Sequence, residues 1–274
     1  SFFLPKRRAA MKRVSFLVKP ASSACSMACT YCFYRDVAQG RTPQVMTDAV
    51  ADALIDRALA LAPDASIAFD FQGGEPTLAG LPFFRRFVAR MAERRDRQHV
   101  SFAIQTNGLA LDDAWCSFLA EHRFLVGVSL DGAQKTHDEF RGLPGSFDRA
   151  IEGMRNAKAA GIKVGLRMTV NWRNWREIAD VFDIMEAEGV KRACFYHLVY
   201  TGRGSALMDE DLDHAETRAA VRLIMDRTRD WFDRGGSPEI LTVDNHADGP
   251  FVYLELLREN PARAEEVLQL LQWN

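Results

Sequence analysis

The chain has 274 residues, of which 47% are hydrophobic and 26% are charged, and its formal net charge at pH 7 is −2. These values are ordinary for a globular protein, and the length fits one large α/β barrel or two small domains. The chain lacks the basic footprint of a nucleic-acid-binding protein, and the apolar run after the basic cluster at 6–13 is too short for a signal peptide or a membrane span. We therefore expect a cytoplasmic protein without nucleic-acid or membrane partners.

The first predicted strand covers 14–18 and leads at Pro20 into a cysteine-rich loop. The loop carries Cys25, Cys29 and Cys32 in a C-x3-C-x2-C spacing. Thiolates this close in sequence are suited to binding one inorganic group, and iron–sulfur cubanes are normally held by four cysteines. Three cysteines would leave one iron with an open position, which is typical of a catalytic metal site.

Two other uses of these cysteines have to be compared with a cluster. A zinc ion could be bound by the three cysteines and one of the six histidines, although zinc knuckles usually pair two short ligand steps across a spacer. A disulfide framework fits less well, because five cysteines in a chain of this length do not resemble a small stapled domain. We expect the remaining two, Cys116 in a helical stretch and Cys194 in an apolar strand, to be structural.

Helical and extended patterns alternate as far as residue 198. The first helix is predicted to begin at Thr47 as its N-cap and to carry Val50, Leu54, Ala58 and Leu61 on its apolar face. The predicted helices cover 47–61, 81–97, 111–121, 147–160 and 174–188, and the further strands cover 66–71, 100–104, 124–130, 163–170 and 193–198. Because each helix connects two strands, the pattern predicts a parallel sheet with right-handed connections.

The pattern changes after residue 200. A loop is predicted at 200–205, a long polar-faced helix at 211–234, a short polar run at 241–248 and a helical region at 253–271 that restarts at Pro261. We therefore divide the chain into a barrel at 14–200 and a helical extension at 201–274. The chain stops without a capping or turn sequence, so we expect a further C-terminal segment to be missing.

A second motif follows the second strand, where Gly73, Gly74, Glu75 and Pro76 form the turn GGEP. Glycines let a ligand approach the backbone, and the carboxylate can accept from an ammonium group. The cysteine triple with Tyr31 before its last cysteine, combined with this turn, resembles the radical S-adenosylmethionine (SAM) enzymes. The resemblance implies a partial (β/α)6 TIM-type barrel whose ligands bind at the carboxyl ends of the strands.

The resemblance also implies the cofactors and their ligands. Cys25, Cys29 and Cys32 are expected to bind a [4Fe-4S] cluster whose fourth iron is chelated by the amino and carboxylate groups of SAM. The GGEP turn is expected to hold the methionine amino group. A one-electron donor such as flavodoxin or ferredoxin would reduce the cluster, which then cleaves SAM to methionine and a 5′-deoxyadenosyl radical that abstracts hydrogen from the substrate.

Three further residues are assigned by the same resemblance. Asn107 and Ser129, at the ends of the third and fourth strands, are expected to contact the SAM ribose, with turn capping as the alternative for Asn107. Arg167 in the fifth strand needs a partner if buried and is expected to meet the SAM carboxylate. Arg141 competes for that role, but beside Asp138 we expect it to be a surface arginine.

Two subfamilies share the resemblance. Residues 16–131, with LVKPASSACSMACTYCFY and FQGGEPTLAG, resemble the anaerobic sulfatase-maturating enzymes, which oxidise a cysteine or serine of a client sulfatase to formylglycine. From His137 onward, FRGLPGSFDRA and CFYHLVYTGRGS resemble the enzymes that trim sirohaem-derived tetrapyrroles in haem biosynthesis. Our first hypothesis is the maturase, with the tetrapyrrole enzyme and a non-enzymatic metal-binding interaction module as alternatives. No cysteine follows Cys194, so auxiliary clusters are expected to be absent or to lie in the missing segment.

Polar residues after the sixth strand are the expected substrate contacts. His197, Tyr200 and Arg203 could face the substrate, and an arginine would suit tetrapyrrole carboxylates. A loop-shaping role is the alternative for all three. Four polar residues further on are expected to form a solvated turn, although they could supply proton-transfer groups: Asp244, Asn245, His246 and Asp248.

Overall fold

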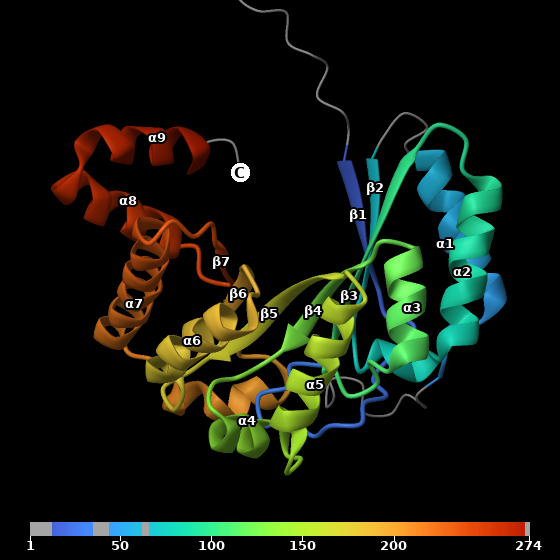
Figure 1. The fold of residues 1–274 in the computed structure, drawn as a ribbon, viewed down its shortest axis with the longest axis horizontal. Coiled ribbons are helices and arrows are strands. Elements are labelled where there is room, and N and C mark those ends of the chain that lie inside the picture. The colour runs from blue at the N-terminus through green and yellow to red at the C-terminus, as the bar shows by residue number, and fades with distance from the viewer. Residues whose placement is uncertain (1–12, 35–43, 62–65, 272–274) are drawn as a thin grey trace, which may run out of the picture.

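The computed structural model describes residues 13–34, 44–61 and 66–271, so the basic cluster lies almost wholly outside it, as do residues 272–274. Seven parallel strands form one sheet that follows the order of the chain. Figure 1 shows this sheet curling into a half-barrel with helices on its outer side, which confirms the predicted α/β fold. The strands are β1 (Arg13–Val18), β2 (Ser66–Phe71), β3 (His99–Thr106), β4 (Leu125–Ser129), β5 (Lys163–Val170), β6 (Arg192–His197) and β7 (Glu239–Val243).

The helices connect these strands and form the C-terminal part. The α-helices are α1 (Asp48–Leu61), α2 (Leu81–Arg94), α3 (Asp113–Glu121), α4 (Gln134–Arg141), α5 (Ser146–Ala159), α6 (Ile178–Glu188), α7 (His214–Asp233), α8 (Asp248–Glu259) and α9 (Pro261–Leu271). Three short 3₁₀ helices are η1 (Pro76–Ala79), η2 (Trp175–Glu177) and η3 (Gly202–Glu210). Among the described helices, none combines the length and apolar character that a bilayer crossing requires.

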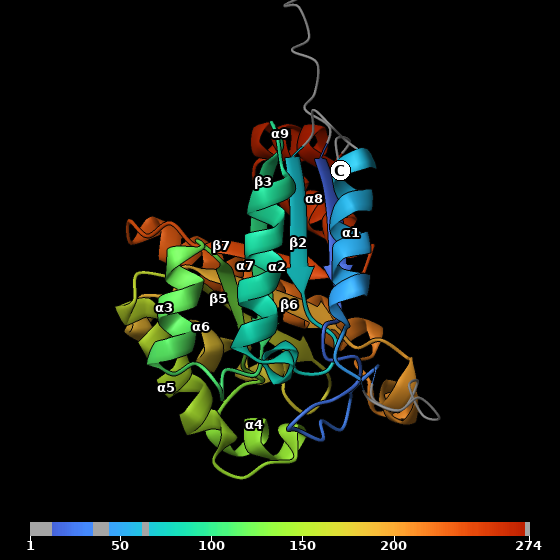
Figure 2. The same cartoon turned by 90° about the vertical axis from the view of Figure 1, so that its right-hand side faces the viewer.

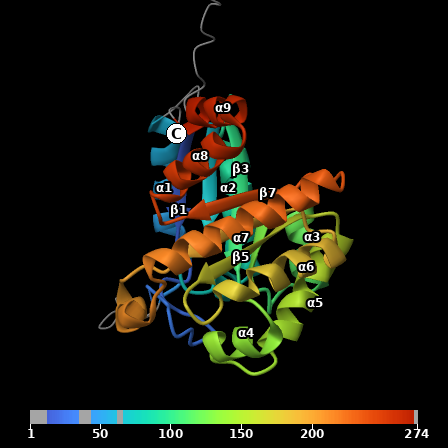
Figure 3. The ribbon, with the colours of Figure 1, turned by 90° about the vertical axis from the view of Figure 1, so that its left-hand side faces the viewer.

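Strand β7 was not predicted from the sequence. It pairs in parallel with β6 at the edge of the sheet. Figure 3 shows it alongside α7, with α8 and α9 beyond it. Its residues, EILTV, are exposed or half-buried, none is fully buried, and they include no long apolar run. Because the strand lies at an edge and is short, its sequence pattern was too weak to distinguish it from a polar loop.

The core lies between the sheet and its outer helices, and its centre is aromatic. Phe71 packs edge-to-face on Phe84 and Phe87, with ring centroids 5.0 and 5.2 Å apart. The predicted face of α1 was only partly right. Leu54 and Ala58 pack inward as expected, but Val50 and Leu61 are exposed, and Ala51 and Ile55 are buried instead.

Candidate active site

Polar residues gather where the strands end, around a cavity of about 190 Å³. In Figure 2, the dark blue loop after β1 lies at this end of the sheet, near α4 and the orange segment that contains η3. Pro76 is buried beside the cavity as the first residue of η1. The other nine residues assigned from the sequence all line it: Cys25, Cys29, Cys32, Gly73, Gly74, Glu75, Asn107, Ser129 and Arg167.

The cysteine loop is held against the end of β2 by backbone hydrogen bonds. Gly74 N donates to Ser22 O at 2.9 Å, and Glu75 N donates to Ala24 O at 2.7 Å. A Cβ atom at position 74 would lie 2.0 Å from Ala24 O, so only glycine permits this approach. The GGEP turn therefore positions the cysteine loop in addition to lining the cavity.

The cysteine side chains receive N–H donors and lie in partly desolvated surroundings. Met27 N donates to Cys25 Sγ at 3.4 Å, and Arg141 Nη1 lies 3.8 Å from Cys29 Sγ. Burial raises the pKa of Cys25 to about 11 and also raises the pKa of Cys29, where the charge of Arg141 opposes the effect. Without a metal these groups are therefore thiols, and metal binding would displace their protons.

The thiol arrangement also bears on the kind of metal group. The three cysteines border one cavity. This arrangement, together with N–H donors directed at two of the sulfurs, fits a multi-iron group with separate thiolate-bound irons.

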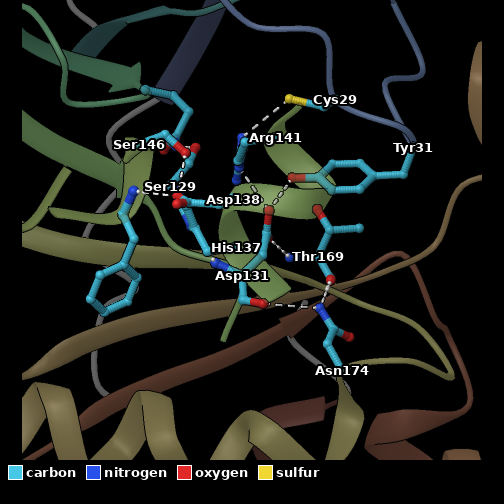
Figure 4. A network of polar contacts seen from close by, with 12 residues as sticks. Cys29, Tyr31, Ser129, Asp131, His137, Asp138, Arg141, Ser146, Thr169 and Asn174 are labelled. Carbon is cyan, nitrogen blue, oxygen red and sulfur yellow. Dashed lines mark hydrogen bonds and ion pairs between the residues drawn. The ribbon is translucent and has the colours of Figure 1, made fainter. Parts of the chain in front are cut away.

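A buried ion pair supports the cysteine loop from below (Figure 4). Asp131, just after β4, is fully buried, and its Oδ2 lies 2.7 Å from Arg141 Nε. The same carboxylate accepts from the Tyr31 hydroxyl at 2.5 Å and from Thr169 N at 3.0 Å. One carboxylate thus joins β4, β5, the end of α4 and Tyr31, the residue before Cys32.

Our expectation that Arg141 is a surface residue was wrong, because it is 8% exposed. The reason is α4, a helix that the sequence analysis did not identify and that ends at Arg141. Its last residues also bond the cysteine loop through the backbone, with Ala28 N donating to Arg141 O and Thr30 N to Phe140 O. The sequence-based prediction assigned no role to Asp131. Its position just after a strand, where site residues gather, could have indicated one.

His137 is hydrogen-bonded to the backbone of Asp131, and its protonation offers a test of how strongly this region is buried. Asp131 N donates to His137 Nδ1 at 3.2 Å, and burial, followed by the charge of Arg141, lowers the pKa of His137 from 6.5 to about 4. Below about pH 6.5 the imidazole of His137 is protonated in the unfolded chain but stays neutral in the folded chain. The free energy of unfolding should therefore be highest above that pH and fall by about 2 kcal/mol between pH 7 and pH 5.

His137→Asn keeps an acceptor for Asp131 N but cannot titrate in this range. Urea denaturation at pH 7 and pH 5 should show a smaller stability loss in the variant than in the wild type. Equal losses in the two proteins would contradict a buried neutral His137.

Glu75 is buried and largely satisfied by the protein. Its Oε1 accepts from Thr77 and from the Thr106 hydroxyl, and its Oε2 accepts from Asn107 N at 2.8 Å. Burial raises the pKa of this carboxyl, while the hydrogen bond from Asn107 N and those from the threonines favour the charged form. A carboxylate has about four acceptor sites, so Oε2 retains capacity for a further donor.

The remaining predicted residues are already engaged with neighbouring side chains. Ser129 Oγ accepts from Gln105 Nε2 at 2.8 Å, and Arg167 Nη1 donates to the Tyr196 hydroxyl at 2.8 Å. Asn107 Oδ1 accepts from Leu109 N, the turn-capping bond considered as its alternative role. Asn107 also donates to the Ser26 hydroxyl of the cysteine loop at 3.1 Å.

A second cavity of about 490 Å³ lies inside the curl of the sheet. Tyr31, Gln105, Arg167 and Tyr196 line both cavities, so ligands in the two would be neighbours. The wall of the second cavity combines apolar residues with polar and charged ones, among them Asp70, Arg167 and Asp244. Its apolar residues include Leu17, Phe71, Ile104, Leu198 and Val199.

Of the three residues expected to face a substrate after β6, only His197 lines this cavity. Tyr200 donates to Asp211 Oδ2 at 2.6 Å, and Arg203 Nη1 donates to Ala28 O and Cys29 O, so Arg203 supports the cysteine loop.

The expected solvated turn after β7 is partly wrong. Asp244 and His246 are exposed as expected, although Asp244 also borders the second cavity. Asp248 is only 4% exposed, because it begins α8 and hydrogen-bonds His197. Cys116 is buried in α3, as predicted, and Cys194 is half-buried in β6.

Comparison with known proteins identifies relatives of both kinds. The model of the Radical SAM superfamily matches residues 20–185. An Fe-coproporphyrin III synthase of Methanosarcina barkeri is 43% identical over 251 residues, covering 91% of this chain and 60% of the relative. A cysteine-type anaerobic sulfatase-maturating enzyme of Clostridium novyi is 34% identical over 185 residues, covering 65% of this chain and 49% of the relative.

A solved structure shows the same arrangement of elements. The structure described as native anSMEcpe with bound AdoMet and Kp18Cys peptide superposes with a TM-score of 0.76 at 29% identity. The superposition covers 90% of this chain and 66% of that one. The present chain thus spans between about half and two thirds of the proteins it matches.

Proposed function

The chain belongs to the radical SAM superfamily, and from that membership we propose that it removes carboxylate-bearing side chains from an iron tetrapyrrole of the sirohaem type. It is an enzyme that uses a [4Fe-4S] cluster and SAM, and not the metal-binding interaction module considered as an alternative. Its relatives include both sulfatase-maturating and tetrapyrrole enzymes. The substrate is therefore the open part of the function.

The observation that carries the tetrapyrrole proposal is the extent of the similarity. The match to the Fe-coproporphyrin III synthase covers 91% of the chain, so it includes most of the residues after 200. The match to the maturase covers 65% at lower identity. The parts that border the second cavity include the end of β6 and Asp244, the residue after β7, which lie in the second half of the chain. We therefore place the tetrapyrrole ahead of the sulfatase peptide, reversing the order suggested by the first half of the sequence.

In this proposal the cysteine loop holds the cluster. Cys25, Cys29 and Cys32 border one cavity, and N–H groups of Met27 and Arg141 point at two of their sulfurs. Hydrogen bonds to cluster sulfurs are a normal means of tuning such sites. When bound, the cluster and SAM supply a one-electron cleavage that yields a hydrogen-abstracting radical, with the electron coming from a donor such as flavodoxin or ferredoxin.

The residues around the first cavity would orient SAM. Glu75 Oε2 has capacity for the methionine ammonium, and the glycines expose the backbone beside it. Ser129 and Asn107 would contact the ribose, and Arg167 would contact the carboxylate while bonded to Tyr196. SAM bound in this way would lie next to the second cavity, where the substrate would be held with little water.

Mass spectrometry of paired substrates tests the proposal. Reconstituted protein with reductant and SAM should convert a didecarboxysirohaem to a product lacking acetate units, and should leave a cysteine-containing sulfatase peptide unchanged. The matched control omits SAM. Formylglycine in the peptide, with no change in the tetrapyrrole, would establish the maturase instead.

A further inference from the structure

We propose that His197 binds the iron of the tetrapyrrole substrate as an axial ligand and that Asp248 fixes the orientation of its ring; this rests on the proposed function. His197 is the last residue of β6 and lines the second cavity. Its Nε2 lies 2.8 Å from Asp248 Oδ2. The side chains are 14% and 6% exposed, so the pair is nearly removed from solvent.

The pair leaves one ring nitrogen available to a ligand. An ionised carboxylate can only accept, so Asp248 places the proton of a neutral imidazole on Nε2. No hydrogen bond to Nδ1 is found among the described residues, so in this tautomer Nδ1 carries a lone pair. Either imidazole nitrogen can bind a metal, and metal-binding histidines usually donate their other N–H to a carboxylate or carbonyl.

The surroundings of His197 combine an apolar wall, which a flat macrocycle can contact, with one arginine and the carboxylates of Asp70 and Asp244. Leu198, Val199 and Ile104 form part of the apolar wall, and Arg167 lies in the wall shared with the first cavity. Arg167 has five N–H donors and uses one of them for Tyr196, so besides its contact with SAM it can donate to a tetrapyrrole carboxylate where the two cavities meet. Iron ligation at His197 would fix the macrocycle relative to SAM at one point, and carboxylate contacts would set its rotation.

Asp248 reaches His197 only because β7 pairs with β6. The chain leaves β7 at Val243 and turns so that Asp248 begins α8 beside the end of β6. A purely structural role would also join β6 to α8, so the test must detect iron coordination and not stability alone.

The test is a titration of the full chain with ferric coproporphyrin III, followed by absorption and EPR spectroscopy. The wild type should shift the Soret band and give the EPR signal of imidazole-ligated iron. His197→Ala should lose this signature and regain it with added imidazole. Asp248→Asn should weaken binding by about 10-fold or more, as expected for a residue that orients a ligand.

Controls separate failure of this inference from failure of the proposed function. His246→Ala removes a nearby exposed histidine and should behave as wild type. Metal-free coproporphyrin III should bind wild type and His197→Ala equally, which also shows that the variant is folded. If both porphyrins bind but His197→Ala keeps the wild-type spectrum, the axial-ligand role is overturned while a tetrapyrrole substrate stands. If neither porphyrin binds the wild type, the tetrapyrrole function itself fails.

Discussion

Replacement of Cys29 by alanine is expected to abolish cluster binding and SAM cleavage together. Cys29 is the central cysteine of the loop, and Arg141 Nη1 lies 3.8 Å from its sulfur. Removing one of three thiolates leaves two protein ligands for a group that normally takes four. Reconstituted Cys29→Ala should therefore lack the visible absorbance of an iron–sulfur cluster and contain little iron and sulfide. It should release no 5′-deoxyadenosine above background when SAM and dithionite are added.

Cys116→Ala is the matched control for this experiment. Cys116 is also a buried cysteine, but it lies in α3, outside both cavities. This variant should keep its iron content and its rate of SAM cleavage. Wild-type cleavage by Cys29→Ala would refute the proposed set of cluster ligands, whereas loss of the cluster in both variants would indicate general unfolding.

The second large effect is expected from Asp131→Asn. Asparagine keeps the shape of the side chain but removes the charge that compensates Arg141, whose guanidinium is also buried. Leaving a buried charge without its partner typically destabilises a protein by about 3–5 kcal/mol. For a chain of this size that corresponds to a decrease in melting temperature of about 10 °C. Thermal and urea denaturation of the cluster-free protein should show the loss directly.

The location of the pair predicts a second readout for the same variant. Asp131 accepts from Tyr31 and pairs with Arg141, and both residues contact or belong to the cysteine loop. Asp131→Asn should therefore also incorporate less iron under conditions that fully load the wild type.

Arg86→Gln serves as the comparison, because it removes an exposed pair with Asp48 that is 3.0 Å long in the wild type. Surface pairs of this kind contribute at most about 1 kcal/mol. Asp131→Asn with a stability and iron content equal to Arg86→Gln would show that the buried pair does not support the loop.

The first prediction tests the proposed cluster ligands, and the second tests the contacts that support the loop carrying them. Cys29 belongs to the group of ligands, whereas Asp131 holds the loop that presents them. The loop is also fixed by backbone bonds from Ala28 and Thr30 to the end of α4. The protein therefore positions the thiols through its own contacts, with the GGEP turn on one side and α4 on the other.

Much of this protein was predictable from the sequence because the relevant signals are local. Six of the seven strands show short apolar runs, and the helices between them show a 3.6-residue period. The cysteine triple and the GGEP turn are defined by spacing within a few residues, and strand polarity brings them to one edge of the sheet.

Contacts between distant residues could be decided only by the tertiary structure. Arg141 was expected at the surface, but the packing of α4 buries it against Asp131. Asp248 was expected in solvent, but β7 brings it to His197, 51 residues earlier in the chain. Sequence periodicity reports which face of an element is apolar, but it does not report which polar side chains meet inside the fold. Those pairings depend on the register of the strands and the way each helix returns to the sheet, and here they determine how the cysteine loop is supported and what borders the second cavity.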